Sequence, residues 1–268
     1  MSIRVPRPVG ATVITPPPNQ KIIIKPVMLV LYSVLVLFSA FAIFFGAQFM
    51  GALLVSIVAT LLGYSGGSIS AAIDSNDLVR FILILVIESF TVWLVYITLK
   101  SSKLSLKSIG LTKRPTLRHL FEAVKGYAIY FVTFLSVFST IGYLRLIDTN
   151  QTQQLGFSNP TGANLLFAFM SLVILPPIAE EILFRGYLYQ RLKLYAPKLS
   201  AIVTSLLFAT AHLELGSGNA PNWSAAIDTF ILSFVLIYVT NKTKSLYPAI
   251  FLHAIKNSIA FVSLFVLK

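Results

Sequence analysis

The chain has 268 residues, of which 56% are apolar and only 11% are charged, and its mean hydropathy is +0.83. Soluble domains are about 45–50% apolar and about 25% charged, so this composition excludes an ordinary soluble protein and predicts an all-α bundle of transmembrane helices. The chain contains no cysteine, which excludes disulfides and thiolate metal sites. The net charge of +12 is attributed to basic cytoplasmic loops rather than to nucleic-acid binding.

Residues 1–26 are rich in proline, which predicts a disordered cytoplasmic tail with no recognisable chemistry. Seven apolar runs follow, and they predict about seven helices of roughly the length that crosses a bilayer, at 27–61, 81–99, 120–144, 164–190, 199–213, 225–240 and 247–267. The first run is too long for one upright span and too short for two spans joined by a turn. A hairpin hidden inside it would raise the number of spans to eight.

Basic residues predict how the helices are oriented. With seven spans and the N-terminus inside, most of the 21 lysine and arginine residues fall in inside segments, while Arg80, Arg145 and Lys268 fall on the outer side. This asymmetry fits the positive-inside rule and predicts a cytoplasmic N-terminus. The chain then divides at the basic loop 101–119 into two N-terminal transmembrane helices, 27–99, and a second transmembrane bundle, 100–268, which contains the candidate catalytic residues described below.

Two adjacent carboxylates and an arginine lie inside the fourth apolar run. Each such charge costs about 2.5–3.5 kcal/mol in hydrocarbon, so a segment that retains three of them has a use for them. Glu181 and Arg185 are four residues apart, which predicts an ion pair on one helix face. Glu180 is rotated by about 100° from Glu181 and is left free to act. Pro176 and Pro177, just before, are expected to kink the helix or to free backbone carbonyls. The alternative is an ion-pair cluster that only fixes helix packing.

Two later apolar runs carry histidines. Phe208 and His212 share one helical face, and so do His253 and Asn257, each pair at a spacing of four residues. Lys256 is expected to point away from His253 and to extend its ammonium toward the membrane surface. A lone membrane histidine is more often a hydrogen-bonding residue between helices than a catalyst. At about 1.5 Å per residue, however, these side chains and the two glutamates lie at depths that let them meet.

Such a group in a dry pocket suits the hydrolysis of an amide. Glu180 is the candidate general base for a water molecule, and His212 would hold that water or pass a proton to the leaving amine. His253 and Asn257 are candidate donors to an oxyanion. The alternative is a Zn²⁺ ion held by Glu180, His212 and His253, which would activate its own water. The spacing differs from HExxH, in which one helix supplies two ligands, and the sequence leaves both mechanisms open.

In their order, and each within an apolar helix, three segments resemble the motifs of the CAAX protease and bacteriocin-processing family, which includes the type II CAAX prenyl endopeptidases: Glu180-Glu-x-x-x-Arg185, Phe208-x-x-x-His212 and His253-x-x-x-Asn257. The resemblance covers residues 100–268, and Gly186 and Ile109-Gly-Leu111 also fit it. It implies an intramembrane endopeptidase that cuts a membrane-embedded or membrane-associated peptide substrate. It also implies the roles given above for Glu180, His212, His253 and Asn257, with support from Glu181, Arg185 and Phe208.

The resemblance implies more about cofactor and location. The family is catalogued as metalloproteases while a metal-free glutamate mechanism is also argued for it, so the expected cofactor is none or zinc. The protein is expected to be a multi-pass protein of a prokaryotic plasma membrane, with the lipid bilayer as its surroundings and no nucleic-acid partner. Two other classes remain as alternatives. One is a non-catalytic membrane scaffold or bacteriocin self-immunity protein, and the other is a transporter, against which the absence of an internal repeat argues.

Overall fold

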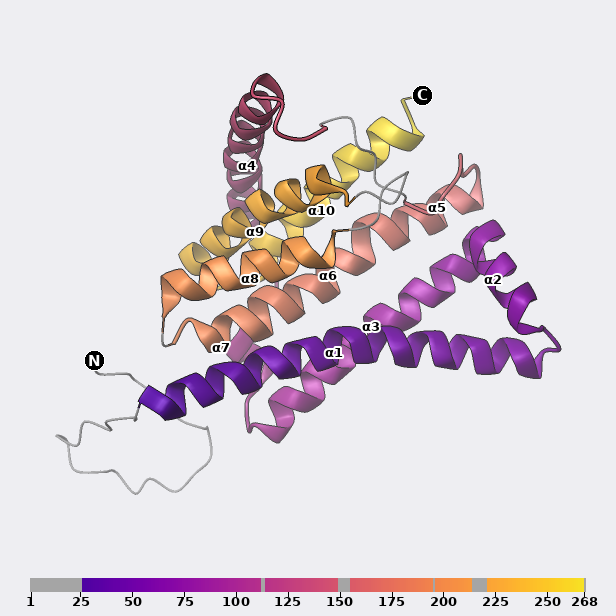
Figure 1. The fold of residues 1–268 in the computed structure, drawn as a ribbon, viewed down its shortest axis with the longest axis horizontal. Helices are drawn as coiled ribbons and strands as arrows, with labels where there is room; N and C mark the ends of the chain where they lie inside the picture. Colours follow the sequence, from indigo (N-terminus) through magenta and orange to yellow (C-terminus); the bar gives the residue numbers. More distant parts are fainter. Residues whose placement is uncertain (1–25, 112–113, 149–154, 195, 214–220, 268) are drawn as a thin grey trace.

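The computed structural model describes residues 26–111, 114–148, 155–194, 196–213 and 221–267, so the predicted tail 1–26 lies almost wholly outside the described residues. The described chain folds into helices, which confirms the all-α prediction (Figure 1). All seven apolar runs are helical. The helices before the motif-bearing run are α1 (Pro26–Leu61), α2 (Gly66–Ser75), α3 (Asp77–Ser101), the short 3₁₀ helix η1 (Leu106–Ile109) and α4 (Leu117–Tyr143).

The fourth apolar run forms one continuous helix, Ala163–Leu192, which is called the motif helix below. Its hydrogen-bonding pattern alternates between α and π turns along α5 (Ala163–Phe169), η2 (Met170–Ile174), α6 (Leu175–Glu180), η3 (Glu181–Tyr189) and α7 (Gln190–Leu192). Three helices follow it: α8 (Pro197–Ala211), α9 (Trp223–Thr243) and α10 (Tyr247–Phe265).

The seven apolar helices differ in length. α1 is a single helix of 36 residues, so the hairpin that would have given eight spans is wrong. Its length of about 54 Å exceeds the roughly 30 Å hydrocarbon core, and tilt or extension beyond the core accommodates the excess. In the described residues, six helices are long and apolar enough to cross a membrane. The seventh, α8, has 15 residues and spans only about 22 Å.

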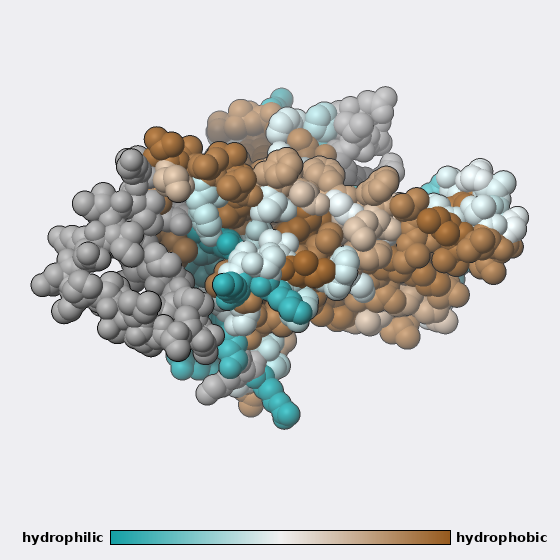
Figure 2. Space-filling view, turned by 90° about the horizontal axis from the view of Figure 1, so that it is seen from below, coloured by the Kyte–Doolittle hydropathy of each residue, from teal (hydrophilic) through white to brown (hydrophobic). Residues whose placement is uncertain are grey.

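The motif helix lies at the centre of the helices. α1 and α3 pack against each other as a pair joined through α2, and α4, α9 and α10 pack together on the other side (Figure 1). Every residue of η3 is buried. The outside of the bundle is apolar instead, as Phe38 and Phe49 on α1 illustrate with exposures of 72% and 68%. Apolar surface dominates the right-hand part of the face in Figure 2, while hydrophilic side chains gather near the middle of the view, beside the residues drawn in grey. This is the surface of a multi-pass membrane protein.

The basic linker docks onto the bundle through two glycines. Gly110 adopts a positive φ of 95°, which favours glycine, and its carbonyl accepts a hydrogen bond of 3.1 Å from the amide of Leu246. A Cβ at Gly186 would lie 2.9 Å from Leu246 Cδ1 and 3.2 Å from Ile109 Cδ1. The two glycines therefore let the linker, the motif helix and the start of α10 approach closely.

Candidate active site

The two prolines of the motif helix free one backbone carbonyl that the rest of the site uses. In an α-helix the carbonyl of Leu172 would accept from residue 176, and in a π-helix from residue 177. Both positions are proline, which has no N–H. Asn257 Nδ2 on α10 donates to this carbonyl instead, at 2.9 Å. The expectation of a freed carbonyl is confirmed, and the carbonyl ties the motif helix to α10.

The predicted ion pair between Glu181 and Arg185 is confirmed. Arg185 Nη1 donates to Glu181 Oε1 at 2.9 Å, and both side chains are fully buried, with 0% exposure. Phe208, also fully buried, lies beneath the guanidinium, and its ring centroid is 4.0 Å from Arg185 Cζ. A cation over an aromatic face is stabilised by the negative charge of the ring face. Phe208 therefore holds the buried arginine, and its own ring also contacts both His212 and His253.

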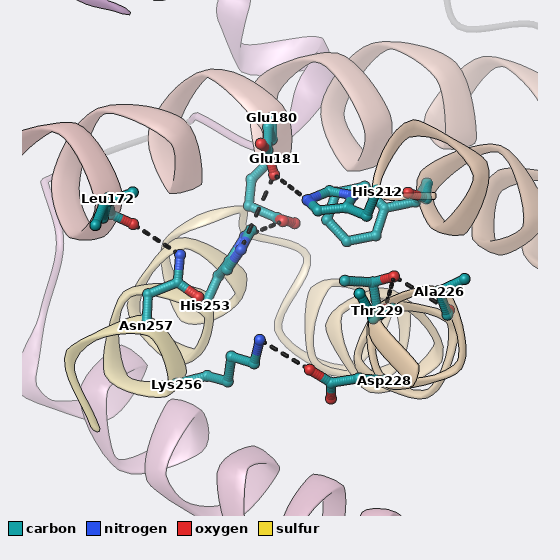
Figure 3. A network of polar contacts seen from close by, with 12 residues as sticks. Leu172, Glu180, Glu181, His212, Ala226, Asp228, Thr229, His253, Lys256 and Asn257 are labelled. Carbon is teal, nitrogen blue, oxygen red and sulfur yellow. Dashed lines mark hydrogen bonds and ion pairs between the residues drawn. The ribbon is translucent and has the colours of Figure 1, made fainter. Parts of the chain in front are cut away.

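Three helices bring Glu180, His212 and His253 together, as predicted (Figure 3). Glu180 Oε2 lies 3.9 Å from His212 Nε2 and 3.9 Å from His253 Nε2. His212 directly follows α8 as its C-cap residue, so this short helix ends where the site begins. His212 Nδ1 lies 2.8 Å from the carbonyl oxygen of Phe208. A carbonyl only accepts, so Nδ1 carries the proton and Nε2 faces Glu180 as an acceptor in the neutral ring.

His253 and Asn257 each have a partner that the sequence did not predict. His253 Nδ1 lies 3.0 Å from Glu181 Oε1. Because Glu181 also accepts from Arg185, its carboxylate is the acceptor and the His253 ring is the donor. This hydrogen bond fixes the orientation of His253 and leaves its Nε2 toward Glu180. Asn257 uses one N–H on the carbonyl of Leu172, so these two side chains do not converge on a single protein acceptor.

A cavity of about 350 Å³ adjoins these groups. One part of its lining is polar and consists of Glu180, His212, Thr229, His253, Lys256 and Asn257. The other part is apolar and consists of Leu155, Leu172, Pro176, Ala260, Phe261, Leu264 and Phe265. A lining that combines apolar side chains with a few polar ones is the usual form of a small binding site.

Two charged membrane residues in this region, Asp228 on α9 and Glu88 on α3, were not identified from the sequence. Lys256 Nζ lies 2.9 Å from Asp228 Oδ2 on α9, so the expectation that Lys256 extends to the membrane surface is wrong. Tyr130 on α4 donates to the other oxygen of Asp228. The signal was present, because Asp228 and Lys256 place opposite charges in two neighbouring spans. Glu88 on α3 is the second, and it lines a separate groove beside Ala179.

Glu180, His212 and His253 were also the candidate zinc ligands. Each histidine makes a hydrogen bond through Nδ1, as metal-binding histidines do. Within the described residues, however, no group of three or more His, Cys, Asp or Glu side chains is arranged to hold a metal ion. The chemistry considered below therefore uses the chain's own residues.

Residues 162–259 match a family model, that of the type II CAAX prenyl endopeptidase Rce1-like proteins. The match is narrower than the 100–268 of the predicted resemblance, but it includes Glu180, His212, His253 and the remaining residues of the three motifs. No curated protein and no solved structure matches the chain. Over residues 162–259 the chain is therefore similar to a family of membrane proteases, the type II CAAX prenyl endopeptidases, which confirms the resemblance that the motifs carried.

Proposed function

We propose that the protein is an intramembrane endopeptidase that hydrolyses a peptide bond of a membrane-embedded or membrane-associated substrate with a water molecule activated by Glu180. One observation carries the proposal. Glu180 Oε2 lies at equal distances of 3.9 Å from two imidazole nitrogens, at the polar side of an otherwise apolar cavity. The match to a protease family supports the same reaction class.

The water would lie between Glu180 and His212. A water oxygen at about 2.8 Å from both Glu180 Oε2 and His212 Nε2 fits a separation of 3.9 Å. Both protein atoms are acceptors, so the water donates a hydrogen to each and turns its lone pair toward the cavity. The oxygen then attacks the scissile carbonyl carbon while one proton passes to Glu180. The tetrahedral intermediate releases the amine when the C–N bond breaks, and Glu180 or His212 returns a proton to that nitrogen.

The oxyanion of the intermediate would be stabilised from α10. His253 donates its Nδ1 hydrogen to Glu181, so a hydrogen for the oxyanion would come from Nε2 once that nitrogen has taken up a proton. Asn257 Nδ2 has a second hydrogen beyond the one given to Leu172. Donors fixed before the reaction begins are the most effective stabilisers of an oxyanion. The proline-freed carbonyl and the Glu181–Arg185 pair would fix these two donors in place.

Burial of Glu180 favours an enzyme over a scaffold or immunity protein. Its Oε2 atom is buried, and no described group donates a hydrogen bond to it. An unsatisfied buried carboxylate destabilises a fold, so a purely structural role gives no reason to retain it. A general base needs a carboxylate oxygen that can accept a proton from a water molecule, so a catalytic role explains why Glu180 is retained.

The test is hydrolysis of membrane peptides by the purified protein in lipid nanodiscs. We expect Glu180→Gln to lower the rate by about 10²–10⁴-fold, the usual contribution of a general base, without changing the thermal unfolding temperature appreciably. Glu122→Gln is the control, because Glu122 is a glutamate that pairs with Lys125 and Lys242 and does not line the cavity. Full turnover by Glu180→Gln would show that the base is assigned wrongly.

Metal analysis of the same preparation addresses the zinc alternative. We expect turnover by the wild-type protein to survive a chelator, because the proposed water is activated by Glu180 and His212. Loss of turnover on chelation and its return with Zn²⁺ would favour the metal mechanism instead.

A further inference from the structure

Lys256 gives the cavity a charge that the proposed hydrolysis does not use. Of the described lining residues, it supplies the one lysine or arginine, and apolar residues of the same helix, such as Phe261 and Leu264, line the cavity with it. Its side chain is 21% exposed. An ammonium in such surroundings is costly unless it is paired. Its position on the cavity wall therefore needs an explanation.

The ammonium is held in place from behind. Lys256 Nζ lies 2.9 Å from Asp228 Oδ2, and Tyr130 donates to the other carboxylate oxygen of Asp228. Three helices, α4, α9 and α10, thus contribute to one network, and Asp228 is not among the residues that line the cavity. Figure 3 shows the lysine side chain reaching from α10 toward Asp228 on α9, on the side of α10 nearest to Thr229.

The network leaves donors for a ligand. An ammonium has three N–H groups, and Asp228 is the one ion-pair partner that Lys256 has among the described residues. Tyr130 occupies the other oxygen of Asp228, so Asp228 contacts the ammonium through one oxygen and the remaining N–H groups of Lys256 are left for a ligand. We propose that Lys256, positioned by Asp228 and Tyr130, forms a subsite that binds a carboxylate of the substrate.

The subsite lies close to the proposed reacting groups, and the inference rests on the proposed function. Lys256 is three residues after His253 and directly before Asn257 on α10, so Lys256 and His253 lie about 5–6 Å apart at Cβ. A peptide residue extends by about 3.3–3.6 Å. The bound carboxylate therefore lies within a few residues of the bond that is cut. It is either the C-terminal carboxylate of the chain or the side chain of an aspartate or glutamate.

The test measures binding rather than turnover, so that it does not depend on hydrolysis. The protein carries Glu180→Gln in lipid nanodiscs, and the ligands are three fluorescent N-acylated tetrapeptides of alanine, valine and leucine. The first has a free C-terminal carboxylate, the second has a C-terminal amide, and the third is an amide that contains one aspartate. Binding to protein-free nanodiscs is subtracted, because charge alters partition into lipid.

We expect the free acid or the aspartate peptide to bind about tenfold to a hundredfold more tightly than the neutral amide, as hydrogen bonds to charged groups do. The peptide that shows the preference identifies the source of the carboxylate. Lys256→Met should bring the ratio of affinities close to 1, and Lys256→Arg should restore most of it. Asp228→Asn should reduce the ratio by releasing the lysine. The control Lys125→Met, which alters an exposed lysine outside the cavity, should keep the wild-type ratio.

Equal affinities for all three peptides would overturn the subsite, and so would a preference that persists in Lys256→Met. Neither result bears on the proposed hydrolysis, which depends on Glu180. Conversely, a preference that requires Lys256 in a protein that cuts no peptide would retain the subsite and reject the protease.

Discussion

Two ion pairs of the same length lie near the cavity, and they differ in their surroundings. Glu181 and Arg185 pair at 2.9 Å within the motif helix, and neither side chain is exposed. Asp228 and Lys256 pair at 2.9 Å between α9 and α10, with exposures of 18% and 21%. The first pair is enclosed by Phe208 and His253, whereas the second pair borders the cavity through Lys256.

This difference in exposure indicates which ion pair is structural and which is available to a ligand. In the enclosed pair neither side chain is exposed to water, so loss of one partner leaves a buried charge that no ion of opposite charge compensates. In the cavity pair, water or a ligand can compensate the lysine. The enclosed pair therefore fixes the position of His253 through Glu181. In the cavity pair, the ammonium of Lys256 is accessible from the cavity.

The largest effect is expected for Arg185→Met, which leaves the Glu181 carboxylate buried beside His253 alone. Breaking a buried pair in this way costs about 3–5 kcal/mol. Denaturant unfolding in bicelles, followed by tryptophan fluorescence, measures the free energy of unfolding. The double variant Glu181→Gln/Arg185→Met should recover much of the loss, since it removes both charges. If the single variant were as stable as the wild type, the enclosed pair would not be structural.

An intermediate effect is expected for Asp228→Asn. The lysine loses its charged partner, but the cavity lets solvent reach the ammonium, so we expect a loss of about 1–3 kcal/mol, below that of Arg185→Met. The same unfolding experiment measures it, and Tyr130→Phe tests the second hydrogen bond to Asp228. A loss equal to that of Arg185→Met would remove the distinction between the two pairs.

The smallest effect concerns the ring beneath the arginine. Phe208→Leu removes the aromatic face that lies 4.0 Å from Arg185 Cζ. Phe184→Leu is the matched control, because Phe184 is buried and packs against the Phe208 ring at 5.1 Å between centroids. We expect Phe208→Leu to destabilise the protein by about 1 kcal/mol more than the control, the value of a cation–π contact. Equal losses would mean that Phe208 acts only by packing.

The sequence was sufficient where the interaction is local. The pairing of Glu181 with Arg185 follows from a spacing of four residues along one helix, and it survives the change from α to π turns in η3. The all-α class and the seven apolar helices follow from composition and run length. The three motifs also indicated the resemblance to a protease family before any geometry was known, and the match at residues 162–259 confirms that resemblance.

The sequence was insufficient where partners come from different helices. Asn257 was expected to donate to an oxyanion together with His253, but the sequence did not indicate that it also donates to a backbone carbonyl of another helix. Lys256 was expected to reach the membrane surface, but it pairs with Asp228. α8 ends at His212 close to its predicted end, but only the structure shows that this end lies beside Glu180. The side of the membrane on which the N-terminus lies and the roles of the individual site residues stay predictions.

By itself, then, the sequence determined what repeats or pairs along one helix: apolar length, the fully buried pair and the order of the motifs. Only the tertiary structure decided which faces of the helices meet, and hence that Glu180 lies 3.9 Å from two histidines of different helices. The physical reason is that hydrogen bonds within a helix are set by local spacing, while contacts between helices depend on tilt, rotation and close approach at positions such as Gly110 and Gly186.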